Sequence, residues 1–228
     1  MRRLRVLHSS DLHGQYKKLL VDHKDTEFDV WLDTGDFYPN RTRPLDAHVR
    51  PDEEQQFQGR WMGFKDLGPR LAAWLRGRPA LTMPGNHDFV YLDSYLRKAK
   101  ARAQRVTTTG VECLGVTWAG FREIPRINGE WAGEAVDFSH VVAETWATSP
   151  DILVTHAPPL GVLDEDDYGC AELAEALSTR AHSIRAHFFG HTHVDGGRQV
   201  RKSTLVFYNG ATHAKVHELE INTRRRGP

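Results

Sequence analysis

The stretch "RVLHSSDLHG", residues 5–14, passes from a short, largely apolar run directly into an aspartate and a histidine. The run is typical of a buried strand, and Asp11 and His13 follow it two positions apart. Gly14, directly behind them, is typical of a turn. A single pair of this kind is a common accident, so its meaning depends on whether the pattern recurs.

The pattern recurs at four further places along the chain. Each is a short apolar run followed by a carboxylate, an amide or an imidazole: 29–32 before Asp36, 80–83 before Asn86, 152–155 before His156, and 186–189 before His191 and His193. Five predicted strands therefore end in residues that commonly bind metal ions.

Segments with helical spacing separate several of these runs. They cover residues 16–23, 54–75, 91–103, 138–146 and 170–180. Strand and helix in alternation predict an α/β fold with a parallel sheet, in which ligands bind at the carboxyl ends of the strands. Another strand is expected over 111–119, and an antiparallel finish over 199–200, 205–208 and 216–221.

Length and composition suit one soluble domain over residues 1–228. Lysine plus arginine and aspartate plus glutamate both number 30, so no overall field draws the chain to nucleic acid or to an anionic membrane. Cys113 and Cys170 have no metal-like or redox-like spacing and are expected to be free thiols rather than a disulfide. The apolar stretch that follows the N-terminus is too short for a signal peptide. A cytoplasmic location is therefore expected.

The five strand ends predict one shared metal site. Because carboxyl ends of parallel strands converge, residues distant in sequence can meet there. The candidate ligands are Asp11, His13, Asp36, Asn86, His156, His191 and His193. These are too many for one ion, whereas two ions about 3.5–4 Å apart and bridged by a carboxylate would use them all.

Asp36 is the expected bridge, because Gly35 lets the backbone come close at that point. One ion would be held by Asp11, His13, Asp36 and His193, and the other by Asp36, Asn86, His156 and His191. Imidazole and oxygen ligands without thiolate favour Mn²⁺, with Fe or Zn²⁺ as alternatives.

The ordered motifs resemble the signature of the calcineurin-like metallophosphoesterase superfamily. The matching residues are Asp11-Leu12-His13, Gly35-Asp36, "PGNHD" at 84–88, His156 and "GHTH" at 190–193. The resemblance implies a four-layer α-β-β-α sandwich with a dinuclear metal site at the strand carboxyl ends. It also implies that Asp36 bridges the ions and that His87 is the catalytic imidazole beside the leaving group.

Departures from the family pattern narrow the choice among the branches of the superfamily. Protein phosphatases of the superfamily carry "GDxxDRG" and "GNHE", whereas here Phe37-Tyr38-Pro39 follow Asp36, and Asp88 follows His87. The nuclease branch has an added capping domain, for which this chain has little room. "THAPP" at 155–159 and "YNGAT" at 208–212 look more like small single-domain phosphodiesterases.

The predicted activity is hydrolysis of phosphate esters by a metal-bridging hydroxide, with His87 protonating the leaving oxygen. A phosphodiesterase acting on a nucleotide or short nucleic acid is favoured. The alternatives are a broad phosphomonoesterase and a non-catalytic metal-binding scaffold. Asp88 either orients the His87 ring or caps a helix over residues 89–95.

Several features keep two interpretations. The segment 37–55, which lacks periodicity, is either a functional cover or a solvated loop, and its Arg41 and Arg43 either bind substrate phosphate or are merely exposed. His213 is either a residue supporting the metal ligands or a solvated histidine. Aromatic residues could form a stacking platform for a base, although core packing is simpler for most of them: Trp61, Phe64, Trp74, Trp118, Phe121, Trp131 and Trp146.

Overall fold

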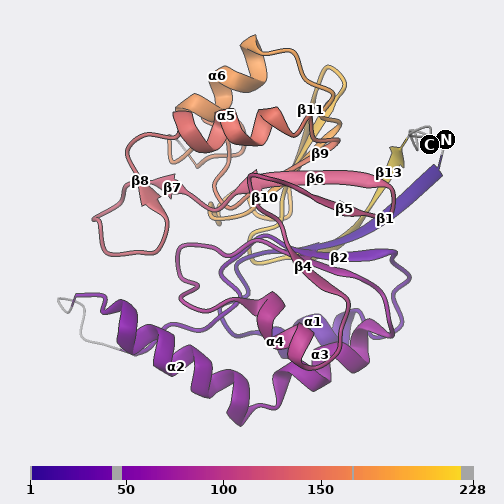
Figure 1. Cartoon of the computed structure of the whole chain (residues 1–228), viewed down its shortest axis with the longest axis vertical. Coiled ribbons are helices and arrows are strands. Elements are labelled where there is room, and N and C mark those ends of the chain that lie inside the picture. Colours follow the sequence, from indigo (N-terminus) through magenta and orange to yellow (C-terminus); the bar gives the residue numbers. More distant parts are fainter. Residues whose placement is uncertain (1, 43–47, 166, 222–228) are drawn as a thin grey trace.

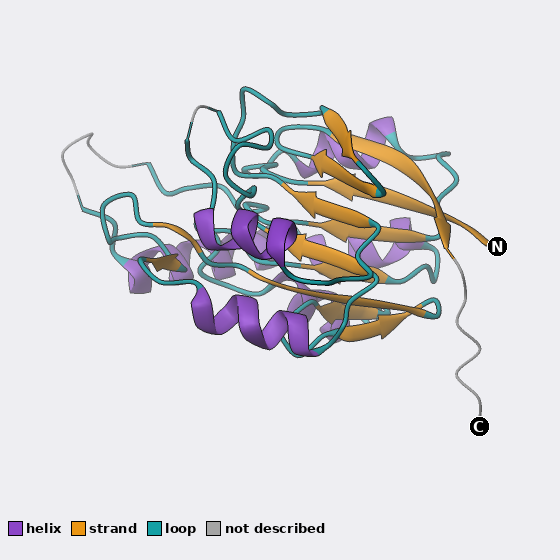
Figure 2. Cartoon of the chain, turned by 90° about the horizontal axis from the view of Figure 1, so that it is seen from above, coloured by secondary structure: helices purple, strands orange, loops and turns teal. Residues whose placement is uncertain are grey.

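Two β-sheets lie face to face in the computed structural model, which describes residues 2–42, 48–165 and 167–221 (Figures 1 and 2). The first sheet contains, in spatial order, β13 (Ala214–Ile221), β1 (Arg2–Ser9), β2 (Val30–Asp33), β3 (Ala80–Thr82) and β4 (Ala103–Arg105). The second contains β11 (Gln199–Lys202), β12 (Leu205–Asn209), β10 (Ala186–Phe189), β9 (Ile152–Thr155), β6 (Val116–Phe121) and β5 (Val111–Cys113).

Helices cover the outer face of each sheet (Figure 1). The first sheet carries α1 (Tyr16–Asp22), α2 (Pro51–Phe64), α3 (Leu67–Leu75) and α4 (Leu92–Lys98). The second carries α5 (Ser139–Ala147) and α6 (Ala171–Thr179). The arrangement is the expected four-layer α-β-β-α sandwich.

The main core lies between the two sheets. Because side chains alternate along a strand, Val6 of β1 faces the second sheet while Leu7 faces the helices. Val6 packs in one cluster with Trp118 of β6 and Phe188 of β10, and all three are fully buried. Strands buried on both faces explain why the sequence shows continuous apolar runs instead of alternation.

The parallel strands of both sheets point towards the same end of the sandwich (Figure 2). In the first sheet β1, β2, β3 and β4 are parallel neighbours, and in the second β6, β9, β10 and β12 are. The two sheets meet at this end through a bridge between Ser10 and Ala211, where the Thr212 amide donates to the Ser10 carbonyl at 3.1 Å. The carboxyl ends that carry the candidate ligands therefore come from both sheets and not from one.

Two predicted elements are each divided in the structure. The helix expected over 54–75 breaks between α2 and α3, where Asp66 adopts a left-handed backbone with a φ of 47°. The strand expected over 111–119 folds back as the hairpin of β5 and β6, with Leu114 and Gly115 at the turn. Both breaks follow from local backbone geometry that hydrophobic periodicity does not register.

The prediction that the last three strands form one antiparallel group is partly wrong. β11 and β12 pair antiparallel, as expected, but β13 crosses to the other sheet and pairs with β1 along its whole length, from Arg2 opposite Ile221 to Ser9 opposite Ala214. The expectation had placed all three strands together. β4 and the small parallel pair β7 (Ile124–Pro125) and β8 (Glu134–Ala135) were not predicted, because such short strands give too little pattern.

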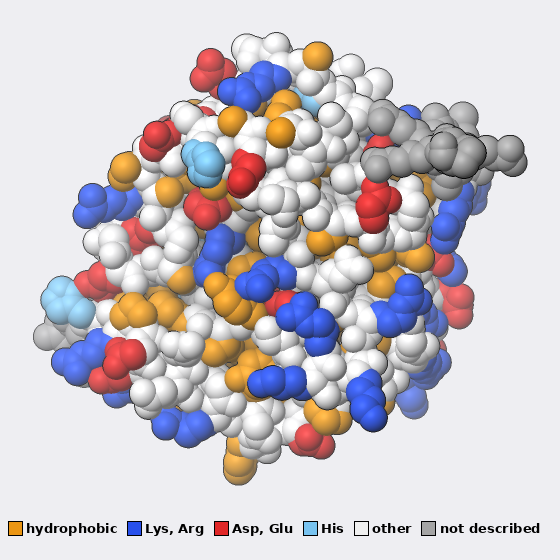
Figure 3. Space-filling view, viewed as in Figure 1, with side chains coloured by type: hydrophobic (Ala, Val, Ile, Leu, Met, Phe, Trp, Pro, Cys, Tyr) orange, Lys and Arg blue, Asp and Glu red, His pale blue; other side chains and the backbone are white. Residues whose placement is uncertain are grey.

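The neutral total charge hides an uneven distribution. Lysine and arginine side chains gather on the face shown in Figure 3, around α4 and β4. Exposed or half-exposed residues of this stretch are Arg97, Lys98, Lys100, Arg102 and Arg105. Positive charge is therefore concentrated locally although the chain as a whole is balanced.

The structure also bears on the membrane and on the state of the cysteines. Within the described ranges, no helix is long and apolar enough to cross a bilayer. Cys113 and Cys170 are both buried and unpaired. The expectation of a single domain over 1–228 stays a prediction.

Substitution of two glycines by alanine should have opposite effects on stability. At Gly120 a Cβ would overlap the Val154 carbonyl oxygen, where β6 and β9 pair closely, so Gly120→Ala should destabilise the fold by about 3 kcal/mol. At Gly63, on the exposed side of α2, a Cβ meets nothing within 4 Å, so Gly63→Ala should stabilise by about 0.5–1 kcal/mol. Urea denaturation of the two variants checks the signs, and equal effects would contradict the close strand approach.

The buried His187 should make stability depend on pH. Burial lowers its pKa from 6.5 to about 3, and its Nε2–H donates to the Thr155 hydroxyl at 2.8 Å. Because the neutral form is favoured in the folded state, its contribution is complete above pH 6.5 and is lost as the pH falls towards 3. Between pH 7 and 5 the wild type should lose about 2 kcal/mol more unfolding free energy than His187→Gln. Parallel losses in the two proteins would show that His187 is not responsible.

Candidate metal centre

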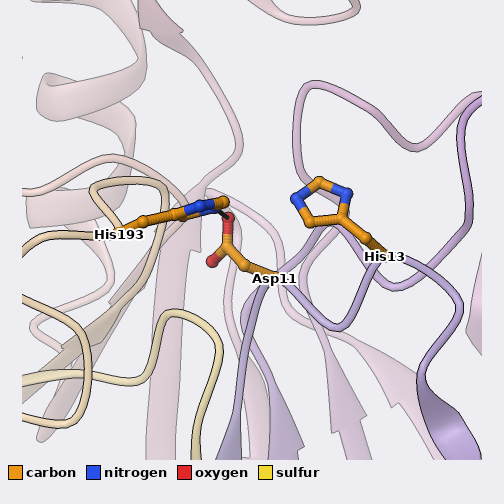
Figure 4. A group of neighbouring side chains, drawn as sticks. All are labelled: Asp11, His13 and His193. Atoms are coloured by element: carbon orange, nitrogen blue, oxygen red, sulfur yellow. Dashed lines mark hydrogen bonds and ion pairs between the residues drawn. The ribbon is translucent and has the colours of Figure 1, made fainter.

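The loop after β1 and the loop after β10 form one group of possible metal ligands. Ligand atoms of Asp11, His13 and His193 all lie within 4.8 Å of one another. The His193 Nε2 lies 3.2 Å from Asp11 Oδ1 (Figure 4), and the other oxygen, Oδ2, accepts from the Ser10 hydroxyl at 2.6 Å and the His191 amide at 2.9 Å. Asp11 thus joins the two sheets and leaves one oxygen facing the imidazoles.

A second group lies beside the first. Asp11, Asp36 and His156 also place ligand atoms within 4.8 Å of one another. The His156 Nε2 is 3.4 Å from Asp36 Oδ2 and 3.0 Å from Asn86 Oδ1. Its Nδ1 contacts the Thr34 carbonyl at 2.8 Å, so Nδ1 carries the proton and Nε2 is free to bind a cation.

Asp36 belongs to the second group and also to a third, in which it lies with His13 and His87. Its Oδ2 is 3.4 Å from His156 Nε2, 3.8 Å from His87 Nε2 and 4.0 Å from His13 Nε2, while its Oδ1 accepts from the His87 amide at 2.8 Å. The ring of His191 lies beside that of His156, with centroids 5.1 Å apart. All seven expected ligands are therefore close neighbours. Their division between two ions, with Asp36 as the bridge, stays a prediction.

The backbone of the ligand loops is strained. Non-glycine residues with positive φ are uncommon, and each costs about 1–2 kcal/mol relative to an ordinary conformation. Four of the seven expected ligands are in this region: Asp11 at 54°, His13 at 42°, Asp36 at 55° and His191 at 68°. Such strain persists where the surrounding structure imposes it, which is typical of functional sites.

Two glycines make the close approach of these loops possible. A Cβ at Gly35 would lie 2.5 Å from the Gly85 amide nitrogen and 2.6 Å from His156 Nδ1. A Cβ at Gly190 would overlap the side chains of Ser10 and Asp11. The expectation that Gly35 lets the backbone come close next to Asp36 is therefore confirmed.

The electrostatics of the site fit a bound cation. Burial would raise the pKa of Asp36, but His156, His87 and His13 hold it well below its usual range. Burial would lower the pKa of His156, but Asp36 and Asp11 raise it to about 9. Two buried carboxylates therefore attract positive charge at a place with little water. A divalent cation with imidazole and oxygen ligands would satisfy this arrangement.

Buried polar atoms at the site agree with that fit. His13 Nδ1 and Asn86 Nδ2 are buried and have no hydrogen-bond partner among the described residues. Buried polar groups normally have partners, so hydrogen bonding within the site is incomplete; a cation would bind Asn86 through Oδ1 and His13 through Nε2, the atoms that face the other expected ligands. The donor set thus fits the divalent metals expected from the sequence.

Asp88 has a different role from both alternatives that the sequence suggested. Its carboxylate does not orient the His87 ring but accepts from the amides of Asp36 at 2.8 Å, Gly85 at 2.9 Å and Tyr38 at 3.2 Å. It does not cap a helix either, since α4 begins at Leu92 with Tyr91 before it. Burial, together with Asp36, raises the pKa of Asp88 to about 6. Asp88 therefore binds the loop after β2 to the loop after β3.

The His87 ring contacts two residues that sequence reasoning did not assign to the site. Its Nδ1 lies 2.8 Å from Asn40 Oδ1, and its ring centroid lies 3.9 Å from that of Trp131. Asn40 belongs to the segment without periodicity, and Trp131 was one of several aromatic residues for which core packing was the simpler interpretation. The only signal in the sequence was that Trp131 lies outside any predicted helix or strand.

The other uncertain residues now have places. The Arg41 guanidinium pairs with Glu53 of α2, and Arg43 lies outside the described residues. His213 donates from Nδ1 to the Ala211 carbonyl at 2.9 Å, and its ring packs over Gly197. Arg41 and His213 therefore contact parts of the chain other than the expected metal ligands.

Comparison with known proteins agrees with the geometry. The profile of the family described as calcineurin-like phosphoesterase matches residues 4–195. A human protein named "Metallophosphoesterase domain-containing protein 1" is 27% identical over 209 residues, which cover 73% of this chain and 64% of the human protein. A UPF0046 protein of Caenorhabditis elegans is 28% identical over 236 residues, which cover 95% of this chain and 72% of its own. The chain thus spans less than two thirds of the human relative.

A solved structure shares the fold. The crystal structure of TT1561 from Thermus thermophilus superposes with a TM-score of 0.57 and 16% sequence identity. The match covers 92% of this chain and 90% of that one. At this identity the likeness concerns the arrangement of helices and strands alone.

Replacement of the central carboxylate should remove both ions. Asp36→Asn should reduce the metal content of Mn²⁺-reconstituted protein from two ions per chain to none, because both expected ions would share this carboxylate. Asp33→Asn is the matched control. Burial and Asp88 raise the pKa of Asp33, and its oxygens accept from the Ser9 hydroxyl at 2.8 Å and the Gly35 amide at 3.3 Å, so this variant changes a buried carboxyl of the same loop that is not an expected ligand. Metal analysis that finds one ion at full occupancy in Asp36→Asn would disprove the bridging role.

Proposed function

Because the chain belongs to the calcineurin-like phosphoesterase family, we propose that it is a metal-dependent phosphodiesterase acting on a small nucleotide-like substrate. The observation that carries the proposal is the placement of His87. Its Nε2 lies 3.8 Å from Asp36 Oδ2, next to the seven expected ligands, but it belongs to neither expected ligand set. An imidazole beside two metal ions suits hydrolysis better than metal binding alone.

The ligands of the two ions would be the seven residues named above, with Mn²⁺ the first candidate metal and Fe or Zn²⁺ next. When bound, two divalent cations supply charge that neutralises the phosphoryl oxygens and lowers the pKa of water. The chain itself keeps both carboxylates ionised and fixes the ring of His156 through the Thr34 carbonyl. It also holds the loops at the distances described.

His87 would act on the leaving oxygen. Asn40 Oδ1 accepts a hydrogen bond from the Nδ1–H of His87, which leaves Nε2 as the nitrogen that faces the site. A proton held on Nε2 can pass to the departing alkoxide, after which the ring is neutral and still bonded to Asn40. The alkoxide gains the proton that Nε2 loses, and the hydrogen bond between Nδ1 and Asn40 is unchanged.

Two observations favour a diester over a monoester. A monoester carries two negative charges near neutral pH and a diester only one, so monoester sites commonly add arginines. Here the Arg41 guanidinium pairs with Glu53, and Arg122 Nη2 donates to the carbonyls of Gly85 at 2.6 Å and Asp88 at 3.0 Å. These two arginines therefore already have protein partners. The half-buried Trp131 beside His87 adds an aromatic surface that suits a nucleotide.

A cytoplasmic location belongs to the same proposal. The buried, unpaired thiols of Cys113 and Cys170 support it, since reduced cysteines are typical of reducing compartments.

Removal of the His87 imidazole should slow the reaction but leave the metals bound. On a diester with a poor alkoxide leaving group, His87→Ala should lower kcat by about 10²–10⁴, the usual contribution of a general acid, with unchanged metal content. Steady-state kinetics and metal analysis of the same preparation measure both effects. Loss of metal in this variant would make His87 a ligand instead of a general acid.

The substrate class is tested with paired esters. With Mn²⁺ present, bis-p-nitrophenyl phosphate should be hydrolysed with a higher kcat/KM than p-nitrophenyl phosphate, and a screen should then include cyclic nucleotides, dinucleotides and single-stranded nucleic acids. The reverse preference would indicate a phosphomonoesterase. No hydrolysis of any ester by metal-loaded protein would indicate a non-catalytic scaffold.

A further inference from the structure

The His87 imidazole is held on two sides by residues outside the metal-binding motifs. We propose that Asn40 and Trp131 are positioning residues that fix the tautomer and the ring plane of His87 for the leaving-group step. The inference rests on the proposed role of His87. It adds two residues from segments that the family signature does not include.

Asn40 determines which nitrogen carries the proton. A side-chain amide oxygen only accepts hydrogen bonds, so the 2.8 Å contact with Nδ1 requires a proton on Nδ1. The other nitrogen, Nε2, then faces Asp36. With the opposite tautomer, the lone pair of Nδ1 would face this oxygen unless the amide turned over, and Nε2 would carry the proton in the neutral ring. Asn40 therefore holds the ring with Nδ1 towards itself and Nε2 towards Asp36.

Trp131 limits rotation of the ring. The indole covers one side of the imidazole, with centroids 3.9 Å apart and planes inclined by 44°. The ring of His13 meets the imidazole at 5.1 Å and 90°. Aromatic contacts of this kind restrict the two side-chain torsions of a histidine. His87 is thus confined between an indole and an expected metal ligand.

The loop that presents Trp131 is built around one carboxylate. Glu134, the first residue of β8, accepts from four amides of the loop between β7 and β8: those of Ile127 at 3.0 Å, Asn128 at 3.1 Å and Trp131 at 3.0 Å, and that of Gly129. Partial burial would raise the pKa of Glu134, but these backbone donors keep it below its usual value. The carboxylate stays ionised, and the loop therefore has a fixed shape.

Two further contacts fasten this loop beside the site. The Ala132 amide donates to the carbonyl of Asn86, an expected ligand, at 3.1 Å. Glu130 accepts from the Val49 amide at 2.9 Å and contacts His48. The position of Trp131 is therefore tied to an expected metal ligand and to the residues just before α2.

A double-mutant cycle tests whether Trp131 acts through His87. Trp131→Ala should lower kcat about 10- to 100-fold on a diester with a poor alkoxide leaving group, and much less on one with p-nitrophenolate, which needs no proton. In the His87→Ala background, Trp131→Ala should have no further effect. Trp131→Phe should retain most of the activity, and Trp146→Ala, which removes a half-buried indole from α5, should leave the leaving-group dependence unchanged.

A spectroscopic measurement tests the proposal without catalysis. The ¹⁵N shifts of the His87 ring in metal-free protein should show protonated Nδ1 in the wild type and in Trp131→Phe, and a mixture of tautomers in Asn40→Ala. Asn40→Asp, which keeps an acceptor oxygen, should restore the wild-type tautomer. An unchanged tautomer in Asn40→Ala overturns the role of Asn40.

The outcomes separate this inference from the proposed function. An equal loss from Trp131→Ala with and without His87 would show that the indole acts on the substrate or on folding, which overturns its positioning role. If His87→Ala itself leaves kcat unchanged, the proposed role of His87 fails. If His87→Ala is slow and Trp131→Ala is not, the positioning inference alone fails.

Discussion

The burial of two carboxylates side by side, where the sheets meet, is the constraint on which the rest of the site depends. Asp11 and Asp36 are each 2% exposed, and each raises the energy of the other's charge. Such a pair is stable only among positive or hydrogen-donating partners. The backbone amides of His191 and His87 donate to these carboxylates, and imidazoles surround them. Divalent cations would supply further positive charge at the same place. The left-handed ligand residues show that the fold accepts local strain to keep the carboxylates together.

The α/β class and the ligand cluster could be predicted from the strand pattern, whereas the four-layer sandwich was expected only from the resemblance to the family. Buried parallel strands are continuous apolar runs, and their carboxyl ends converge. The loops after β1, β2, β3, β9 and β10 accordingly bring together the seven expected residues. What the pattern could not give was the choice of sheet, because apolar strands of both sheets look alike. For that reason the strand at 216–221 was expected in an antiparallel group with those at 199–200 and 205–208, whereas β13 pairs with β1.

Asn40, Trp131 and Asp88 show a second limit of sequence reasoning. Asn40 and Trp131 reach His87 from segments without periodicity, and their approach depends on loop contacts such as those of Glu134. Asp88 follows His87 directly, which suggested a contact between their side chains. Its carboxylate instead accepts the amides of Asp36 and Gly85 and so supports the left-handed backbone of the central residue. Adjacency in sequence was therefore a poor guide to the partner of each side chain.

The pairing of β1 with β13 has a consequence for the ends of the chain. Arg2 lies opposite Ile221, so the described ends are neighbours (Figure 1), while Ser9 at the other end of the ladder leads into the ligand loop. Eight residues of extended strand span about 25 Å. A group attached at Arg2 or Ile221 would thus start at the end of the sandwich opposite the expected ligands. A short peptide linker between these two residues would likewise leave the face with the expected ligands uncovered.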